Sequence, residues 1–508
     1  LPFVSGLFQK GKAWGWAGIF LMASSIVVQA QFTCITNNGT ITITGYTGSV
    51  GVVTIPSSMN GLPVTRIGQQ AFFNNGILTN VSIPNSITHI EYGAFWVCPN
   101  LVRVTIGTGV ISIGERAFAS SSLTNIVVPN GVTDISPYTF GDCRSLARVS
   151  LSTNTVFIEQ EAFAGCSNLP GMIIPTSVRI IGTGAFSRCT GMTNIMIPDG
   201  VGIIEDYAFE SCGALESLDI PRSVLFIGEG VFSRCGSLAG ITVSTNNDHY
   251  TSVNGVLFTA PGDWLMQCPA RKSGAYLVPA GVEHIANNAF QGCGELTGVT
   301  IDNSVRSVGD YAFDACSNLL GATIGNSVTN IGDSAFNGCV SLAGIELPDS
   351  VLFIGNDAFR DCRSMTHVVL GDGVWGIGHR VFSGCSSLAN VMIPDSVDIL
   401  GSVFDNCAGL TNVSLGTGIS SVDWWTFRNC TNLTHLIIPD NVDKIKQEAF
   451  DGCLNLAGVY FQGSAPVPTG TNWFRGATNA TVYRLPGAAG WPEVPGLWAG
   501  RPTALWLP

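Results

Sequence analysis

Charged side chains are scarce in this sequence of 508 residues. Asp, Glu, Lys and Arg together make up 11% of it, less than half of the roughly 25% that is usual in soluble domains. The 23 Lys and Arg are outnumbered by 35 Asp and Glu, for a formal net charge of −12, and they form no basic run. Nucleic acids and anionic membranes are bound by clustered positive charge. The composition therefore argues against both, and we expect no nucleic-acid partner.

Histidine is equally scarce, with six residues that do not cluster. His367 and His435 share a position in the repeat described below but lie three repeats apart, about 14 Å in a stack of strands, which is too far to hold one metal ion. The sequence has no G-x-S-x-G, H-E-x-x-H or Walker motif, and no G-x-G-x-x-G that opens a helix. We therefore expect no enzyme: no catalytic residues, no metal site, no cofactor and no small-molecule substrate.

The N-terminus has the features of an export signal. Two lysines precede an apolar stretch over residues 13–28, which ends in the small-residue pattern Val28-Gln29-Ala30. A membrane anchor is the weaker alternative, because about 16 apolar residues fall short of the ~20 that span a bilayer. Residues 1–30 are thus predicted to be a signal peptide, and the protein to be secreted or displayed at the cell surface.

One phrase repeats along most of the chain. A pair such as Ala-Phe, usually followed three residues later by Cys, returns every 23 residues, with two intervals of 22. With the phenylalanine as marker, the first series is Phe72, Phe95, Phe118, Phe140, Phe163, Phe186, Phe209 and Phe232. The second series is Phe290, Phe313, Phe336, Phe359, Phe382, Phe404, Phe427 and Phe450. Sixteen copies at one spacing indicate a protein built from stacked coils.

Each part of the unit A-F-x-x-C-x-x-L-x-x-V-x-I-P-x-x-V-x-x-I-G-x-x has a local meaning. The V-x-I stretch, as at 391–393, alternates like a short strand. The phrase at 331–336, Ile-Gly-Asp-Ser-Ala-Phe, predicts a turn into a short helical coil, with the acidic residue capping free N–H groups. A single unit cannot fold alone, because burying about eight apolar side chains at ~1.5–3 kcal/mol each is offset by ordering 23 residues at ~1–2 kcal/mol each. The units must stack.

The full phrase resembles the BspA-type leucine-rich repeat of bacterial and some protist surface proteins, over about residues 61–462. The resemblance implies a right-handed leucine-rich-repeat solenoid, with parallel β-strands, short helical or 3-10 turns, about 16 regular coils and one irregular coil. It also implies surface display and the binding of host or neighbouring proteins. The sequence departs from the family phrase at Asn75, where cysteine is expected, and at 118–123, which is one residue short and lacks the cysteine. Neither departure should break the stack.

The regular coils are interrupted once and flanked twice. The interval of 58 residues between Phe232 and Phe290 predicts an insertion at about 244–281, with a hairpin that turns at Ala260-Pro261-Gly262-Asp263. Before the array, residues 31–60 are predicted to form a β cap over the first open edge. After it, residues 463–508 are rich in Pro, Gly and Trp and are predicted to form a C-terminal cap, whose completeness the sequence leaves open.

Sixteen cysteines in a secreted protein would ordinarily predict a disulfide framework. Fourteen of them, however, lie in one register, three residues after the marker: Cys98, Cys143, Cys166, Cys189, Cys212, Cys235, Cys293, Cys316, Cys339, Cys362, Cys385, Cys407, Cys430 and Cys453. Stacked coils bring their Cα atoms to about 5 Å, but the Cβ vectors run parallel and do not converge as a bridge requires. The spacing favours a buried column of free thiols that fill space. Pairwise bridges are the alternative, and Cys34 and Cys268 are unassigned.

Recognition in a solenoid is expected at the outward positions that vary. Ten residues after the marker the outward residue is usually Ser or Thr, but in the last five coils it is Val369, Met392, Ser414, Ile437 and Tyr460. Two positions earlier these coils carry His367, Asn390, Asn412, His435 and Gly458. Apolar side chains flanked by imidazoles and amides are typical of a protein-binding stripe. The candidate binding residues are therefore His367, Val369, Met392, His435, Ile437 and Tyr460.

Two alternatives to this stripe stay open. Scattered exposed apolar residues are normal on protein surfaces and carry no function by themselves. A rival row lies six residues before the marker, at Phe157, Ile180, Ile203 and Phe226, and its pattern does not decide between packing and exposure.

The sequence as a whole predicts a secreted or cell-surface protein that binds other macromolecules non-covalently, most simply as an adhesin. The expected partner is an extracellular-matrix or other surface protein. A function of a different class fits the same residues: a structural spacer that presents another module and has no ligand of its own.

Overall fold

The computed structural model describes residues 31–468 and 472–507, so the predicted signal peptide lies outside the described residues. The chain divides into two compact units, residues 1–180 and 181–508, which are described one at a time below. Every regular element in the described residues is a strand. Accordingly, the described part holds no helix long and apolar enough to cross a membrane.

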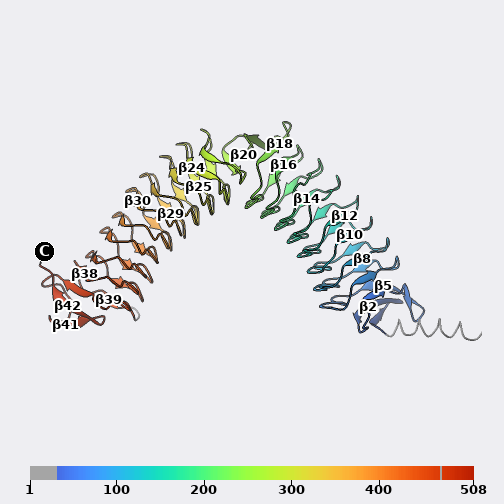
Figure 1. Cartoon of the computed structure of the whole chain (residues 1–508), viewed down its shortest axis with the longest axis horizontal. Coiled ribbons are helices and arrows are strands. Elements are labelled where there is room, and N and C mark those ends of the chain that lie inside the picture. Colours follow the sequence, from blue (N-terminus) through green and yellow to red (C-terminus); the bar gives the residue numbers. More distant parts are fainter. Residues whose placement is uncertain (1–30, 469–471, 508) are drawn as a thin grey trace, which may run out of the picture. The chain divides into compact units, whose positions relative to one another are not determined.

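The first unit is a stack of coils, most of which contribute two short strands (Figure 1). The V-x-I stretches form one parallel sheet, in the order β12(Arg148–Ser150), β10(Asn125–Val127), β8(Arg103–Thr105), β6(Asn80–Ser82) and β3(Val52–Thr54). In β6, β8 and β10 the middle residue is buried and both flanking residues are exposed. This alternation is the one expected for strands with one face on the core.

The second strand of each coil is only two residues long. In the first unit these strands are β7(His89–Ile90), β9(Ser112–Ile113), β11(Asp134–Ile135) and β13(Phe157–Ile158), while β14(Ile180–Ile181) lies at the boundary of the two units. At the N-terminal end β1(Phe32–Asn37) pairs antiparallel with β2(Thr40–Tyr46), and β2 pairs parallel with β5(Leu62–Ile67), which also pairs with β4(Ser58–Met59). β5 continues into the coils by pairing with β7.

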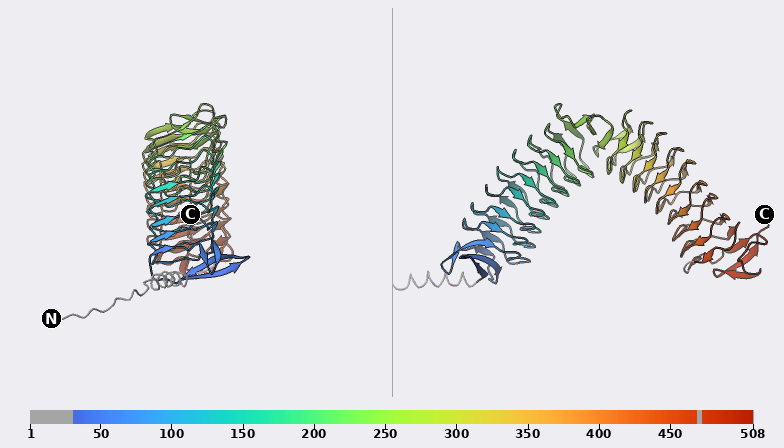
Figure 2. Two further views of the ribbon diagram at one scale, coloured as in Figure 1. Left: turned by 90° about the vertical axis from the view of Figure 1, so that its right-hand side faces the viewer. Right: turned by 180° about the vertical axis from the view of Figure 1, so that it is seen from behind.

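The second unit has the same construction (Figure 2). Its longer strands first form the pair β16(Ser217–Ile220) and β18(Gly240–Val243). A seven-stranded sheet follows, formed by β22(Gly274–Leu277), β24(Leu296–Thr300), β26(Gly321–Thr323), β28(Gly344–Glu346), β30(His367–Val369), β32(Asn390–Met392) and β34(Asn412–Ser414). The last sheet is formed by β36(His435–Ile438), β38(Gly458–Phe461), β40(Thr481–Arg484), β42(Arg501–Leu505) and the antiparallel edge strand β41(Gly496–Trp498).

The two-residue strands of the second unit also pair in parallel. They are β15(Ile203–Ile204), β17(Phe226–Ile227), β23(His284–Ile285), β25(Ser307–Val308), β27(Asn330–Ile331), β29(Phe353–Ile354), β31(Gly376–Ile377), β33(Ile399–Leu400), β35(Ser421–Val422), β37(Lys444–Ile445) and β39(Val467–Pro468). The interruption between Phe232 and Phe290 forms an antiparallel meander of β19(Tyr250–Val253), β20(Val256–Thr259) and β21(Trp264–Gln267). β21 then pairs in parallel with β23.

The marker phenylalanines form stacked rows in the core of each unit. Ring centroids of successive markers lie 4.7 to 5.8 Å apart from Phe72 to Phe163. In the second unit they lie 4.6 to 6.0 Å apart from Phe290 to Phe450. The ring of Phe474 stacks on that of Phe450 at 5.2 Å, so the row continues into the C-terminal region. Each marker is almost completely buried.

The fourteen cysteines of the common register form a buried column beside the phenylalanine rows, and all sixteen cysteines are free thiols. Most thiols of the column do more than fill space, because each donates a hydrogen bond to the carbonyl of the marker in the preceding coil. The oxygen of Phe336, for example, accepts from the backbone N–H of Cys339 and from the Cys362 thiol, both at 3.2 Å. Cys268, unassigned from the sequence, is buried beside Cys293. The Sγ of Cys293 lies 3.9 Å from the carbonyl oxygen of Cys268.

The short helical turns expected at the marker are not found in the described residues. A helix needs i→i−4 bonds, whereas here alternate N–H groups point to the next coil: Ser334, Phe336 and Gly338 donate to the carbonyls of Asn356, Ala358 and Arg360, at 2.7 to 2.9 Å. The residues two before and two after the marker have left-handed φ angles, 53° at Ser334 and 70° at Gly338, and the same pair flanks all sixteen markers. This alternation turns the phrase into a third ladder between coils.

The acidic residues before the marker consequently cap no helix. Asp310 Oδ1 accepts the backbone N–H of Asp333 at 2.7 Å, and Asp333 Oδ1 accepts that of Asn356 at 2.6 Å. Asn287 and Asn356 make the same bond to the next coil. These side chains satisfy free N–H groups as predicted, but each group belongs to the following coil and not to a helix.

Candidate binding surface

The candidate residues lie on the outward face of the longer strands of the second unit. Val369 ends β30, Met392 ends β32, and Ile437 lies in β36. Their side chains are 51%, 70% and 47% exposed, which is high for apolar residues. Met392 is in register with Ser414, and Ile437 with Tyr460. The strand geometry thus places these residues in one row, which we call the apolar row: Val369, Met392, Ser414, Ile437 and Tyr460.

Both candidate histidines are exposed at the first residue of their strands, His367 on β30 and His435 on β36. Each ring Nδ1 is hydrogen-bonded to the hydroxyl of the preceding threonine, at 3.2 Å for His367 and 3.1 Å for His435. The His367 ring lies over Gly344 of the neighbouring strand, where a Cβ would collide with it. Within the described residues, no group of three or more His, Cys, Asp or Glu could hold a metal ion.

Tyr460 belongs to an aromatic group at the C-terminal end of the apolar row. Its ring stacks on Tyr483, with centroids 4.5 Å apart, and meets Trp506 edge-on at 5.4 Å. His435 lies on the other side, with its ring centroid 5.9 Å from that of Tyr460. Partial burial in this group raises the pKa of Tyr460. Tyr460 is therefore half-buried, unlike Val369 and Met392.

A groove of about 840 Å³ opens beside this aromatic group. Ile437, Tyr460 and Trp506 supply its apolar lining, and Asn412 and Gln462 supply amides. Among the residues that the structure describes, no lysine, arginine, aspartate or glutamate lines it. The sheet that ends with β34 and the one that begins with β36 meet at this groove. It can receive a neutral or apolar segment of a partner, with amides available for hydrogen bonds.

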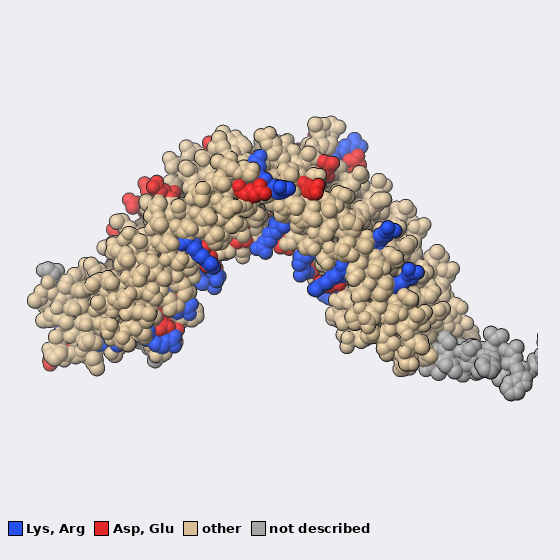
Figure 3. All heavy atoms as spheres, viewed as in Figure 1, with Lys and Arg blue, Asp and Glu red and all other residues tan. Residues whose placement is uncertain are grey.

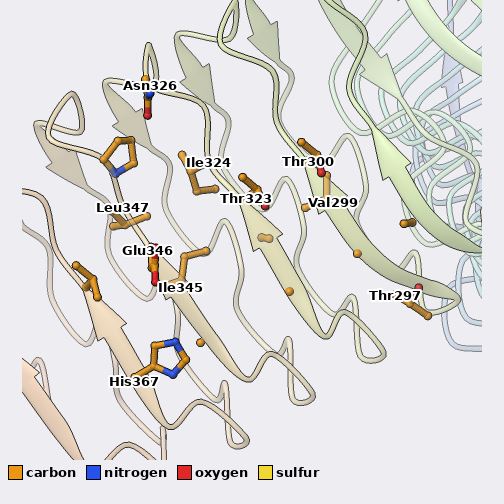
Figure 4. Close-up of a pocket in the computed structure, with 17 residues that line it drawn as sticks. Thr297, Val299, Thr300, Thr323, Ile324, Asn326, Ile345, Glu346, Leu347 and His367 are labelled. Carbon is orange, nitrogen blue, oxygen red and sulfur yellow. The ribbon is translucent and has the colours of Figure 1, made fainter.

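A second hollow of about 720 Å³ lies on the same face, over β24 to β30 (Figure 4). Its floor lacks side chains because the position eight residues after the marker is glycine in three successive coils: Gly298, Gly321 and Gly344. His367 lies at one end, and Thr300, Thr323 and Glu346 line the hollow. This hollow was not predicted from the sequence, although the recurring glycine was visible there.

Sequence reasoning also missed Tyr483 and Trp506, which complete the aromatic group. They fall in the region predicted as a Pro-, Gly- and Trp-rich cap. The signal that reveals them is the repeat itself, since Tyr483 follows Tyr460 by 23 residues and Trp506 follows Tyr483 by 23 residues.

Exposed apolar residues occur in the same register outside the apolar row as well. Val127 and Ile173 in the first unit are 66% and 85% exposed, and Met196 in the second unit is 79% exposed. The description of these positions as mostly Ser or Thr overlooked them. The rival row is only partly open: Phe226 is 51% exposed, whereas Phe157, Ile180 and Ile203 are half-buried.

Charge is sparse on the face shown in Figure 3, where a few Lys, Arg, Asp and Glu side chains are scattered over a largely uncharged surface. Many of the charges that do occur are paired between coils, such as Arg428 with Asp405 at 2.7 Å and Lys446 with Asp423 at 2.8 Å. Uncharged side chains therefore dominate this face.

Comparison with known families supports the repeat assignment. The model of the BspA type leucine-rich repeat region matches the chain over residues 65–177, 156–258, 283–402 and 352–481. No significant match is found among curated proteins.

Several solved structures of bacterial proteins are similar to this chain. A leucine-rich cell surface protein of Faecalibacterium prausnitzii is 31% identical, with a TM-score of 0.58, over 76% of this chain and 93% of that one. A leucine-rich repeat protein of Eubacterium ventriosum is 22% identical, with a TM-score of 0.47, over 84% of this chain and 93% of that one. The pneumococcal vaccine antigen PcpA is 19% identical, with a TM-score of 0.41, over 85% and 91% of the two chains.

Proposed function

Because this chain belongs to the BspA-type leucine-rich repeat family, we propose that it is a secreted or cell-surface protein that binds other proteins non-covalently and acts as an adhesin. The Faecalibacterium protein, to which it is similar over most of its length, is described as a cell surface protein. The export-like N-terminal segment supports the same location. A non-enzymatic role fits the scarcity of histidine and of catalytic motifs.

The observation that carries this proposal is the apolar row on the strand face. Val369, Met392 and Ile437 expose about half or more of their side chains. Val369 and Met392 lie on the neighbouring strands β30 and β32, and Ile437 follows on β36, beyond β34. Rows of exposed apolar side chains with a polar surround mark interaction sites. The aromatic group adds Tyr460 and Trp506, residue types enriched among the side chains that dominate binding energy.

The partner contact is assigned to this row together with the uncharged groove. A protein segment that crosses the strand face would cover Met392 and Ile437 and insert an apolar or neutral side chain beside Trp506. Full burial of one such side chain is worth ~1.5–3 kcal/mol. His367 and His435, at the first residue of their strands, would contribute hydrogen bonds at the rim.

The test is a binding measurement on the mature chain with immobilised extracellular-matrix and surface proteins. For a member of that panel that binds, the double variant Met392→Ser with Ile437→Ser should bind at least about tenfold more weakly, because two apolar contacts of ~1.5 kcal/mol or more are lost. The matched control is Met196→Ser, an equally exposed methionine in the same register, which should bind normally.

Thermal unfolding of each variant controls for the fold, and both midpoints should stay close to that of the parent protein. Normal binding by the double variant would remove the apolar row from the proposal. Failure of the parent chain to bind any member of the panel would favour the alternative, a structural spacer.

A further inference from the structure

In the second unit, the insertion interrupts the regular stack of coils between β17 and β21. β17 is the last strand of its sheet, and β21 begins the contact with the next coil by pairing with β23, where Trp264 is in register with His284. At the position three residues before the marker the two coils still touch, since the Asn287 amide donates to Glu229 Oε2 at 3.0 Å. The coils are thus joined there and held apart at the strands by β21.

A pocket of about 480 Å³ lies between β17 and β21, and we call it the notch. Phe226 lines one side, and Trp264 and Met266 line the other. Phe226 is 51% exposed and Trp264 is 39% exposed, so both rings are accessible to a ligand. His284 stacks on the Trp264 indole at 4.5 Å but does not line the notch, which therefore leaves another part of the indole open.

Two carboxylates complete the lining of the notch, Asp206 and Glu229. Asp206 Oδ1 accepts the backbone N–H of Glu229 at 2.8 Å, and Glu229 Oε2 accepts from Asn287. No lysine or arginine of the described part of the chain lines the notch. Among the described residues, neither carboxylate forms an ion pair, whereas Asp405, Asp423 and Asp451 each pair with a cation of the next coil or the C-terminal region. The notch thus combines aromatic faces with unpaired negative charge.

We propose that the notch binds the guanidinium group of an arginine side chain on a partner protein. A planar guanidinium stacks on aromatic faces and donates paired hydrogen bonds to a carboxylate. The net charge of −12 favours the approach of a cationic partner. Phe226 and Trp264 would hold the plane of the group, and Asp206 and Glu229 would accept its N–H bonds. This site is separate from the apolar row and does not depend on the proposed function.

The test uses small probes in place of a partner. The protein is labelled with 5-fluorotryptophan, and the resonance of residue 264 is assigned with the Trp264→Phe variant. Nα-acetyl-arginine methylamide should shift this resonance in a saturable manner. The citrulline counterpart, which has nearly the same shape but no charge, should bind at least about fivefold more weakly, as expected for loss of a cation–π contact and an ion pair.

The isosteric double variant Asp206→Asn with Glu229→Gln should weaken arginine binding by a similar factor. The matched control, Asp333→Asn with Glu346→Gln, removes the same two charges away from the notch and should bind as the parent does. Equal affinity for arginine and citrulline, or unchanged affinity in the first double variant, would overturn the proposal. Tighter binding of free spermidine than of the arginine probe would overturn the choice of a protein arginine. None of these outcomes bears on the apolar row, which is tested with other residues.

Discussion

The ring of Phe313 stacks on the ring of Phe336, with centroids 4.9 Å apart and planes 9° from parallel. Twenty-three residues separate them in sequence, and one coil separates them in space. The same relation holds along the rows of markers, so the interior of each unit consists of continuous rows of like side chains. Outward positions are freed from packing, and it is these that vary between coils.

Truncation of one ring should be costly because the row cannot close the gap. Phe336→Ala is expected to lower the free energy of unfolding by about 3–5 kcal/mol, the usual cost for a fully buried phenylalanine. Phe353→Ala, at a position 37% exposed in the same coil region, should cost far less. Urea unfolding followed by circular dichroism measures both. Similar losses for the two variants would contradict the stacked core.

The Asp333 carboxylate should stabilise the fold through its hydrogen bond to the next coil and not through its charge. Asp333→Ala removes the acceptor for the backbone N–H of Asn356 and is expected to destabilise the protein by about 1–2 kcal/mol. Asp333→Asn keeps an acceptor oxygen and should stay within about 0.5 kcal/mol of the parent. The comparison is made by urea unfolding at neutral pH. An equal loss in both variants would mean that the charge is what matters.

Two glycines with crowded surroundings should differ in how well they tolerate replacement by alanine. A Cβ at Gly325 would collide with the backbone carbonyl of Asp302 in the preceding coil, which cannot move. The nearest atoms to a Cβ at Gly344 belong to the exposed His367 ring, which can swing into solvent. Gly325→Ala should therefore lower the free energy of unfolding by more than about 1 kcal/mol and the thermal midpoint with it. Gly344→Ala should leave the thermal midpoint nearly unchanged. The reverse order would contradict the packing of the coils.

Stability should fall at high pH because the buried thiols resist ionisation. Burial raises the pKa of Cys98 and Cys143 to about 11 and that of Cys235 to about 12. A raised pKa in the folded state gives stability that is complete below the unfolded value near 9 and is lost as the pH rises through the folded value. At pH 10 each such thiol should lower the free energy of unfolding by about 1.4 kcal/mol relative to its value below pH 9.

Urea midpoints between pH 8 and pH 10.5 test this dependence. Cys235→Ala should show a smaller decrease over that range than the parent, since one titrating thiol has been removed. A decrease that is the same in the variant would assign the effect to other groups.

The period of the repeat predicted most of the fold, because residues such as Phe313 and Cys316 face the same environment in every coil. The turn at the marker was predicted as helical, and the reason for the error is physical. The left-handed position two residues before the marker holds residues as different as Tyr138, Trp425 and Glu448, so residue preference gives little signal of the backbone there. It is set instead by hydrogen bonds to the next coil.

The candidate surface was predicted in part. Val369, Met392 and Ile437 are exposed as expected, since strand alternation fixes their direction. The partners of Tyr460 were missed because Tyr483 and Trp506 lie in a stretch without the Ala-Phe phrase. The notch could not be predicted at all, since it depends on how β21 fits between two coils, which spacing does not encode.

The most direct test of the central claim, continuous buried rows of like residues, is to count reactive thiols by mass. Iodoacetamide at pH 8 should modify at most Cys34 in the folded protein, because the other fifteen thiols are buried. After unfolding in denaturant without reductant, all sixteen should be modified. Several adducts on the folded protein, or fewer than sixteen on the unfolded one, would contradict the account.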